Sequence, residues 1–217
     1  MLWWQSVSDE TDVTACGYRV LVKRLAIAGG IGAGKTALAE HLTSRGWPVV
    51  DADLVARRVV EPGEPAWRAL RDAFGTAVLT GDNEIDRAFL ADIVFRDATA
   101  LRRLNHITHG YIAEEIMRQI AATSADVVFI ALPLYRDEHR NQLGLDEVWA
   151  VEVDPEVAVA RLIESRGFSE ADARARLAVQ MSNEARRALA DRVISNEGTR
   201  EELTVKVDEA LRALGVA

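Results

Sequence analysis

The glycine-rich stretch at residues 25–36 constrains the fold of this chain more than any other part of the sequence. Gly29 is followed by four residues and then by Gly34-Lys35-Thr36, which matches the pattern G-x-x-x-x-G-K-[ST] in full. Glycines let the backbone wrap closely around an anion and turn its N–H groups inward. A helix that begins near Lys35 adds the positive end of its dipole to the same place. The stretch therefore predicts a loop that binds the phosphates of a nucleotide.

The motif also assigns roles to individual residues. Lys35 is expected to reach the β- and γ-phosphates, and the hydroxyl of Thr36 is expected to bind Mg²⁺. The backbone of the whole loop and of the first helical turn is expected to surround the phosphates. The residues predicted to bind the nucleotide are Gly29, Gly30, Ile31, Gly32, Ala33, Gly34, Lys35, Thr36 and Ala37.

The sequence on both sides of the loop fits this interpretation. Leu25 to Ala28 is a short apolar run, as expected for a buried parallel strand. Residues 36–45 have the pattern of an amphipathic helix, and Gly46 is a suitable C-cap. The glycines lack the spacing of G-x-G-x-x-G, which argues against a dinucleotide-binding turn.

The rest of the chain alternates between expected strands and helices. Further strands are predicted at 47–51, 126–133, 147–153 and 192–196. A mostly helical segment fills 54–122, an arginine-rich helical pair lies between the last two strands, and an amphipathic helix spans 199–214. This order predicts an α/β fold with a parallel sheet and helices on both faces.

The layout resembles that of small-molecule and nucleoside-monophosphate kinases. The resemblance implies a P-loop kinase with three α/β/α layers, a helical acceptor-binding lobe and an arginine-rich helical lid. We expect an N-terminal extension at 1–18, a nucleotide-binding core formed by 19–53, 124–155 and 190–217, the lobe at 54–123 and the lid at 156–189.

Composition limits the partners of the protein. The 217 residues carry a formal net charge of −8, which argues against nucleic acid as the main partner. No apolar run approaches the roughly 18 residues that a membrane span needs, and residues 1–18 lack the pattern of a secretory signal. The single cysteine, Cys16, excludes an intrachain disulfide. We expect a cytoplasmic monomer or small homo-oligomer with small-molecule substrates.

Two aspartates follow the second expected strand. Polar side chains at the carboxyl end of a parallel strand point into the ligand crevice, so Asp51 and Asp53 are candidates for a functional site. The alternative for Asp53 is a helix N-cap in front of Leu54. For Asp51, a role in capping or turn structure is equally compatible with the sequence.

Several ordered motifs resemble the dephospho-CoA kinase family over residues 25–214. They are Gly29 to Thr36, Val50-Asp51-Ala-Asp53-Leu-Val-Ala-Arg57, Val60-Glu-Pro-Gly-Glu-Pro-Ala66, Phe74-Gly75, Ile85-Asp86-Arg87, Ile93-Val-Phe95, His106 to Ile112, Pro133-Leu134 and Ala190 to Gly198. The resemblance implies ATP-dependent phosphorylation of the ribose 3′-hydroxyl of dephospho-CoA, the last step of coenzyme A synthesis. ATP is then the co-substrate, and Mg²⁺ the metal.

The resemblance also implies residue roles. Asp53 is implied as the general base on the acceptor hydroxyl, and Lys35 with Mg²⁺ as the neutralising charge. Arg161 or Arg166 is implied as the lid arginine that contacts phosphate. The residues implied to line the acceptor lobe are Arg57, Asp86, Arg87 and His109. Arg57 and Arg87 are also compatible with a solvated helix face, and His109 with a packed helix position.

Three positions depart from the family pattern. Gly110 replaces a proline, Tyr135-Arg136-Asp137 replaces an L-x-E segment, and Arg192 replaces an aspartate. The first two fall on the acceptor side. They leave open a divergent P-loop kinase for another nucleoside-like or pantetheine-like alcohol. A non-catalytic ATP-binding regulator is a further alternative, whereas a switch GTPase is disfavoured because no Asn-Lys-x-Asp segment occurs.

Overall fold

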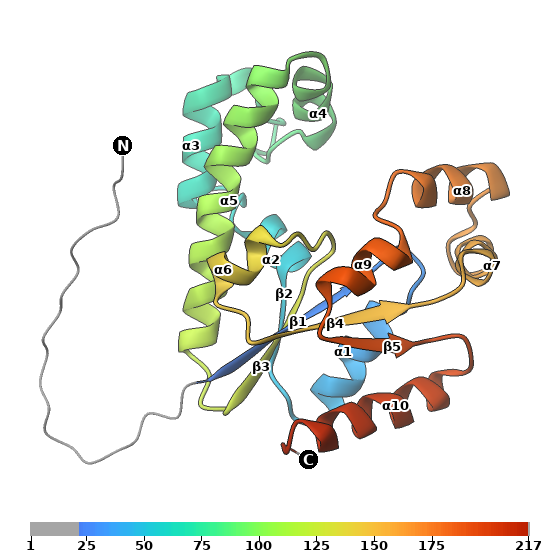
Figure 1. Ribbon diagram of the computed structural model, residues 1–217. Coiled ribbons are helices and arrows are strands. Elements are labelled where there is room, and N and C mark those ends of the chain that lie inside the picture. Colours follow the sequence, from blue (N-terminus) through green and yellow to red (C-terminus); the bar gives the residue numbers. More distant parts are fainter. Residues whose placement is uncertain (1–21, 217) are drawn as a thin grey trace, which may run out of the picture.

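A parallel β-sheet forms the centre of the molecule (Figure 1). The structure is a computed structural model that describes residues 22–216, so the predicted extension at 1–18 lies outside the described residues. The five strands lie in the order β2-β3-β1-β4-β5. Their bounds are β1 (Lys23–Gly29), β2 (Val49–Asp51), β3 (Val127–Ala131), β4 (Glu147–Glu152) and β5 (Arg192–Ser195).

Helices connect all of these strands, as a parallel sheet requires. In chain order they are α1 (Lys35–Ser44), α2 (Ala52–Arg58), α3 (Pro65–Phe74), the 3₁₀ turn η1 (Thr76–Val78), α4 (Arg87–Arg96), α5 (Ala98–Ala121), α6 (Glu138–Leu143), α7 (Pro155–Arg166), α8 (Glu170–Ala178), α9 (Asn183–Leu189) and α10 (Arg200–Ala213).

Alternation along the strands separates two apolar layers. Leu25 and Ile27 of β1 face one side, where they join the cluster that includes Leu38 of α1 and Leu211 of α10. The intervening residues of β1, Ala26 and Ala28, face the other side, which α2 and α5 cover. The two clusters lie on opposite faces, so the predicted three-layer α/β/α arrangement is confirmed.

Large aromatic side chains fill the layer next to α1 and α10. Phe129 lies edge-on between Trp47 and Trp149, with ring centroids 6.4 and 5.3 Å away. Phe129 and Trp149 are both fully buried.

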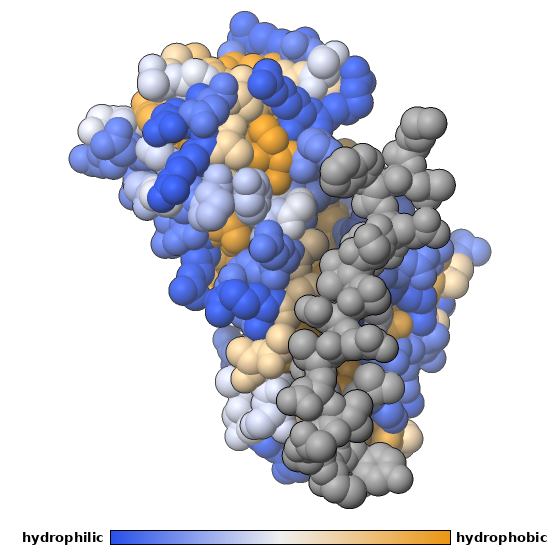
Figure 2. Space-filling view, turned by 90° about the vertical axis from the view of Figure 1, so that its left-hand side faces the viewer, coloured by the Kyte–Doolittle hydropathy of each residue, from blue (hydrophilic) through white to orange (hydrophobic). Residues whose placement is uncertain are grey.

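Two groups of helices extend beyond the two ends of the sheet. In Figure 1, α3, α4 and the first half of α5 rise above one end of the sheet, and α7 and α8 lie beyond its other end. Figure 2 shows the face that carries α3 and α5, where the described residues are mostly hydrophilic with apolar patches between them. The division into core, lobe and lid stays a prediction. No helix among residues 22–216 is long and apolar enough to cross a membrane.

The structure differs from the predicted bounds at a few places, and helix capping explains the first of them. The helix predicted from Leu54 begins at Ala52, because the Asp51 side chain accepts hydrogen bonds at its N-terminus. The strand predicted from Trp47 begins only at Val49. The sequence did not predict the 3₁₀ turn η1 or the isolated β-bridge between Leu79 and Ile85. Both are short features of the connection between α3 and α4.

Helix α10 provides a test of the core. Leu211 is fully buried under the sheet, whereas Val205 on the same helix is 54% exposed. We expect Leu211→Ala to lower the free energy of unfolding by about 2–5 kcal/mol, because it leaves a cavity in a packed layer. Val205→Ala is the matched control and should change it by less than about 0.5 kcal/mol. Urea denaturation followed by tryptophan fluorescence measures both, and equal effects would contradict this description of the core.

Candidate active site

The phosphate-binding loop joins β1 to α1 in a conformation that its glycines make possible. Gly32 and Gly34 have φ angles of 76° and 100°, a region that side chains disfavour. A Cβ atom on Gly34 would lie only 2.1 Å from Nδ2 of Asn196. Position 34 therefore needs glycine for two reasons, its φ angle and the close approach of Asn196.

Asn196 connects the end of β5 to the phosphate-binding loop. It is 6% exposed and follows β5, where its backbone N–H donates to the carbonyl of Glu152 at 2.7 Å. Its side-chain Nδ2 donates to the carbonyl of Ala33 at 2.8 Å. The family resemblance placed Asn196 in a motif, but the sequence did not reveal that its side-chain amide supports the loop.

The Lys35 ammonium lies against the start of the loop. Its Nζ donates to the carbonyl oxygens of Gly29 at 2.6 Å and Gly30 at 3.2 Å. Burial, together with the positive charge of Arg186, lowers the pKa of Lys35 to about 8, although the Asp53 carboxylate opposes both effects. The Lys35 ammonium is thus partly desolvated and only partly compensated by negative charge. A bound phosphate would supply that charge.

The two aspartates after β2 have different surroundings. Oδ1 of Asp51 accepts hydrogen bonds from the backbone N–H groups of Asp53 at 2.8 Å and Leu54 at 3.2 Å, so Asp51 is the N-cap of α2. Asp53 lies in the first turn of α2 and is exposed. Asp53 is therefore not the helix cap, and the cap role, left open by the sequence, belongs to Asp51.

A cleft of about 730 Å³ brings the main predicted residues together. Lys35 and Thr36 come from the loop and α1, Asp53 from α2, and Arg161 and Arg166 from α7. The loop residues that line it are Gly30, Ile31, Gly32, Gly34, Lys35, Thr36 and Ala37. The cleft therefore combines cations and backbone N–H groups with three exposed carboxylates, those of Glu40, Asp53 and Glu164.

The two candidate lid arginines lie on the same helix but differ in their contacts. Nη2 of Arg161 donates to the carbonyl of Gly198, in the loop after β5, at 3.0 Å. Arg166, in the last turn of α7, is exposed. Its positive charge lowers the pKa of Lys35, so it adds positive potential to the phosphate-binding side of the cleft.

The four residues predicted for the acceptor lobe are not gathered at one place. His109 of α5 lines a smaller cavity of about 180 Å³ that also reaches Asp53 and His139. Burial lowers the pKa of His139, and the nearby positive charges of Arg136 and His109 lower it further against the opposing Glu138. Asp86 is the N-cap of α4, where it accepts from the N–H of Phe89 at 2.9 Å. Arg57 and Arg87 are exposed and line neither this cavity nor the larger cleft.

The three departures from the family pattern lie in different environments. Gly110 is exposed on α5, and a Cβ atom there would meet nothing within 4 Å. Tyr135 is 6% exposed in the core next to α5. The guanidinium of Arg192 lies over the Trp149 ring, 5.8 Å from its centroid. None of the three lines the cleft that holds Lys35 and Asp53.

Two further residues contact the loop, and sequence reasoning did not select them. Oε1 of Gln180 accepts a hydrogen bond from the backbone N–H of Ile31 at 2.9 Å. The guanidinium of Arg186 lies close to Gly30. The run of arginines marked this part of the chain, but only the fold shows which of them turns inward.

Comparison with known proteins gives a consistent result. The family model described as dephospho-CoA kinase matches residues 24–202. Dephospho-CoA kinase from Corynebacterium glutamicum is 40% identical over 191 residues, which cover 87% of this chain and 97% of that protein. Dephospho-CoA kinase from Thermobifida fusca is 41% identical over 194 residues, which cover 88% of this chain and 96% of that protein.

Solved structures share the fold. TT1252 from Thermus thermophilus superposes with a TM-score of 0.78 at 29% identity, covering 89% of this chain and 98% of the other. Dephospho-CoA kinase from Campylobacter jejuni gives a TM-score of 0.65 at 22% identity, covering 88% and 96%. Shikimate kinase from Bacteroides thetaiotaomicron gives 0.52 at 15% identity, covering 89% and 98%. The last two comparisons concern the fold alone.

The lowered pKa of Lys35 predicts a pH-dependent effect on stability. The folded-state pKa is about 8 and the ordinary value 10.5, so between these pH values the unfolded chain binds the proton more tightly. The destabilising contribution of Lys35 is therefore complete below about pH 8 and disappears as the pH rises towards 10.5. We expect Lys35→Met to be more stable than the wild type at pH 7.5, with the difference shrinking by pH 9.5.

Urea denaturation of the nucleotide-free proteins at both pH values measures this difference. Comparing the two proteins at each pH cancels the titration of all other groups. A difference that is independent of pH, or that grows between pH 7.5 and 9.5, would contradict the assigned burial of the ammonium.

Proposed function

The chain belongs to the dephospho-CoA kinase family, and from this premise we propose how its residues transfer a phosphoryl group from ATP to the ribose 3′-hydroxyl of dephospho-CoA. The observation that carries the proposal is the meeting of Lys35, Thr36 and Asp53 in one cleft, while Asp51 is occupied as a helix cap. The Asp53 carboxylate, just after β2, and the phosphate-binding elements thus line the same cleft.

In this proposal Asp53 is the general base. Its carboxylate accepts the proton of the 3′-hydroxyl as that oxygen forms a bond to the γ-phosphorus of ATP. The bond between the γ-phosphorus and the β,γ-bridging oxygen breaks, and ADP leaves with the electron pair. Lys35 stabilises the negative charge on the phosphates, and the loop N–H groups orient them. Positioning and charge neutralisation provide most of the rate acceleration in such transfers.

The residues present fit a magnesium ion that is shared with the nucleotide. The described residues hold no cluster of three or more His, Cys, Asp or Glu side chains that could bind a metal by themselves. Mg²⁺ bound with nucleotide needs only one or two protein oxygens, because phosphates and waters complete its shell. The hydroxyl of Thr36, exposed at the cleft, is the proposed protein ligand. When bound, the ion neutralises phosphate charge.

In this proposal, α7 carries an arginine that closes over the bound substrates. Arg166 is exposed at the cleft and is placed to contact the phosphates when the substrates are bound. Arg161 is held at the loop after β5 by its bond to Gly198 and is the second candidate. Closure over both substrates excludes water and limits the hydrolysis of ATP.

The acceptor is proposed to approach Asp53 from the side of α5. The smaller cavity that joins Asp53 to His109 supports this direction. Contacts of Arg57, Asp86 and Arg87 with the acceptor stay predictions, as do the cytoplasmic location and the oligomeric state. The departure at Tyr135–Asp137 is the feature that favours a different alcohol as acceptor.

Asp53 and Asp51 form a matched pair for testing the base. Asp53→Asn removes the proton acceptor but keeps the size of the side chain, so we expect turnover to fall by about 10²–10⁴-fold with little change in MgATP affinity. Asp51→Asn keeps an oxygen for the helix cap and should reduce turnover by less than about tenfold. The assay is ADP release from MgATP with and without dephospho-CoA. Near-normal turnover by Asp53→Asn would refute the assignment of Asp53 as the base.

The same assay separates the alternative functions. Strong stimulation of ADP release by dephospho-CoA, but not by pantetheine or adenosine, supports the proposed acceptor. Stimulation by one of the other alcohols alone would indicate a divergent kinase. MgATP binding without acceptor-dependent ADP release would indicate a regulator.

A further inference from the structure

Arg186 is an arginine that the fold buries next to the phosphate-binding loop. It lies on α9 and is only 7% exposed. Its Nη1 donates to Oδ1 of Asn183 at 2.8 Å, and its Nη2 donates to the carbonyl of Met181 at 2.8 Å. Both acceptors are neutral. The two bonds use a minority of the five N–H donors that a guanidinium carries.

The negative charge that acts on Arg186 belongs to Glu152, which is bonded to a different arginine through one of its two oxygens. Glu152 favours the charged form of Arg186, but its own Oε2 accepts a bond from Nε of Arg187 at 2.6 Å. Burial is the larger effect and lowers the pKa of Arg186. A buried charge without a dedicated counter-ion is costly, so its retention requires an explanation.

The guanidinium faces the first part of the loop. A Cβ atom placed on Gly30 would lie 3.5 Å from Nη2 and 3.8 Å from Nη1 of Arg186. The carbonyl of the same residue, Gly30, accepts a bond from Nζ of Lys35. Arg186 and Lys35 therefore lie at the same edge of the loop, where Lys35 is expected to reach the β- and γ-phosphates.

The two cations oppose each other in the absence of an anion. Among neighbouring charges, Arg186 makes the largest contribution to the lowered pKa of Lys35. Arg186 lines a cavity of about 400 Å³ with Gly30 and Ile31, and Lys35 lines the adjoining cleft with the same two loop residues. Two desolvated cations close to the same anion-binding N–H groups are an arrangement expected around a bound anion. An anion placed there would stabilise the charged forms of both side chains.

The position of Arg186 does not depend on movement of α7. Gln180, between α8 and α9, accepts the bond from Ile31 N–H and so fixes this connection to the loop. The bond to Asn183 orients the guanidinium from within α9 itself. Arg186 is therefore held in place by the loop and α9, whereas Arg161 and Arg166 extend from α7.

We propose that Arg186 is a catalytic residue that contacts the terminal phosphate of ATP through its remaining N–H donors. A planar guanidinium matches two phosphate oxygens at once, and negative charge on those oxygens must be stabilised during transfer. This inference deepens the proposed function and depends on it for the identity of the nucleotide. It adds an arginine of α9, which also lies within the predicted lid at 156–189, to the α7 arginine implied by the family resemblance.

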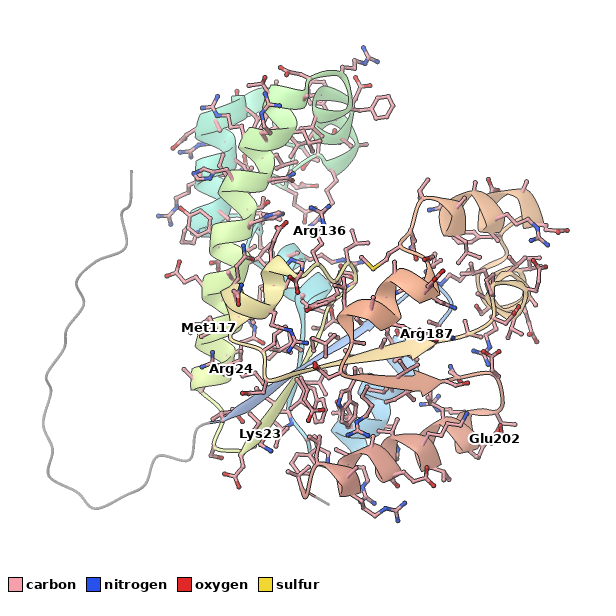
Figure 3. All side chains as sticks on the ribbon, viewed as in Figure 1. Lys23, Arg24, Met117, Arg136, Arg187 and Glu202 are labelled. Atoms are coloured by element: carbon pink, nitrogen blue, oxygen red, sulfur yellow. The ribbon has the colours of Figure 1, made fainter. Side chains whose placement is uncertain are left out.

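The experiment compares substitutions at two adjacent arginines of α9. Arg186→Gln removes the charge but keeps amide donors for Asn183 and the Met181 carbonyl. Arg187→Gln is the matched control, because Arg187 is exposed, points away from the loop and pairs with Glu152 (Figure 3). Turnover of MgATP with dephospho-CoA is measured, together with the affinities for MgADP and for the Mg²⁺ complex of the non-hydrolysable analogue AMP-PNP, by calorimetry.

We expect Arg186→Gln to lower kcat by about 10²-fold or more, as for the loss of one donor to a transition-state oxyanion. Its affinity for AMP-PNP should fall by about tenfold or more, while its affinity for MgADP, which lacks the terminal phosphate, stays within about threefold. Arg187→Gln should stay within about threefold of the wild type in all measurements. Arg186→Lys, which retains the charge, should lose less activity than Arg186→Gln.

Three results would overturn the proposal. They are a kcat of Arg186→Gln within threefold of the wild type, an equal loss by Arg187→Gln, and an equal loss of affinity for MgADP and AMP-PNP, which would indicate a purely structural role. If Arg186→Gln does not fold, Arg186→Lys decides by the same measurements, and wild-type kcat in that variant overturns the proposal. Absence of dephospho-CoA-dependent turnover in the wild type would refute the proposed function instead, and the two affinities would still test Arg186.

Discussion

The contact between Gly34 and Asn196 is the constraint on which the geometry of the cleft depends. The amide of Asn196 occupies the space where any side chain at position 34 would stand, and it also bonds to the carbonyl of Ala33. Through this contact the end of β5 supports the loop that follows β1, although more than a hundred residues separate them. The loop can present its N–H groups to an anion because its outer side is already fixed by the sheet.

The order of the strands then decides which side chains surround the loop. β1 lies in the middle of the sheet, with β3 and β4 on either side. The carboxyl ends of all strands meet at the same edge, so α2 contributes Asp53 and α7 contributes Arg161 and Arg166 to the same cleft. The Asp53 carboxylate and the cations Lys35, Arg161 and Arg166 thus line one space. This arrangement suits a reaction that brings an alcohol and a phosphate together.

The cationic residues around the nucleotide-free site share a lack of compensating negative charge. Lys35 has a lowered pKa, Arg186 is buried beside neutral acceptors, and Arg166 adds positive potential from α7. Each of these arrangements costs stability in the absence of an anion and becomes favourable when phosphate is bound. Asp51, by contrast, uses its carboxylate to cap α2, although it also lines a cavity with Lys35 and Thr36. Neighbouring residues of the same type therefore have different roles because of their hydrogen bonds.

The amino-acid sequence was enough to predict the phosphate-binding loop and the alternation of strands and helices, because these depend on local spacing and on periodicity. Ordered motifs indicated the family, whose resemblance implied the α7 arginines. The rule that strand ends share an edge placed Asp53 in the ligand crevice. The three-dimensional fold was needed to show that Asp51 caps α2, that Asn196 supports the loop and that Arg186 rather than Arg187 lies close to it. It also placed Arg57 and Arg87 outside the three cavities that reach Asp53. These outcomes depend on which face of a helix meets the loop and on contacts between residues far apart in the chain, and neither is encoded in local spacing.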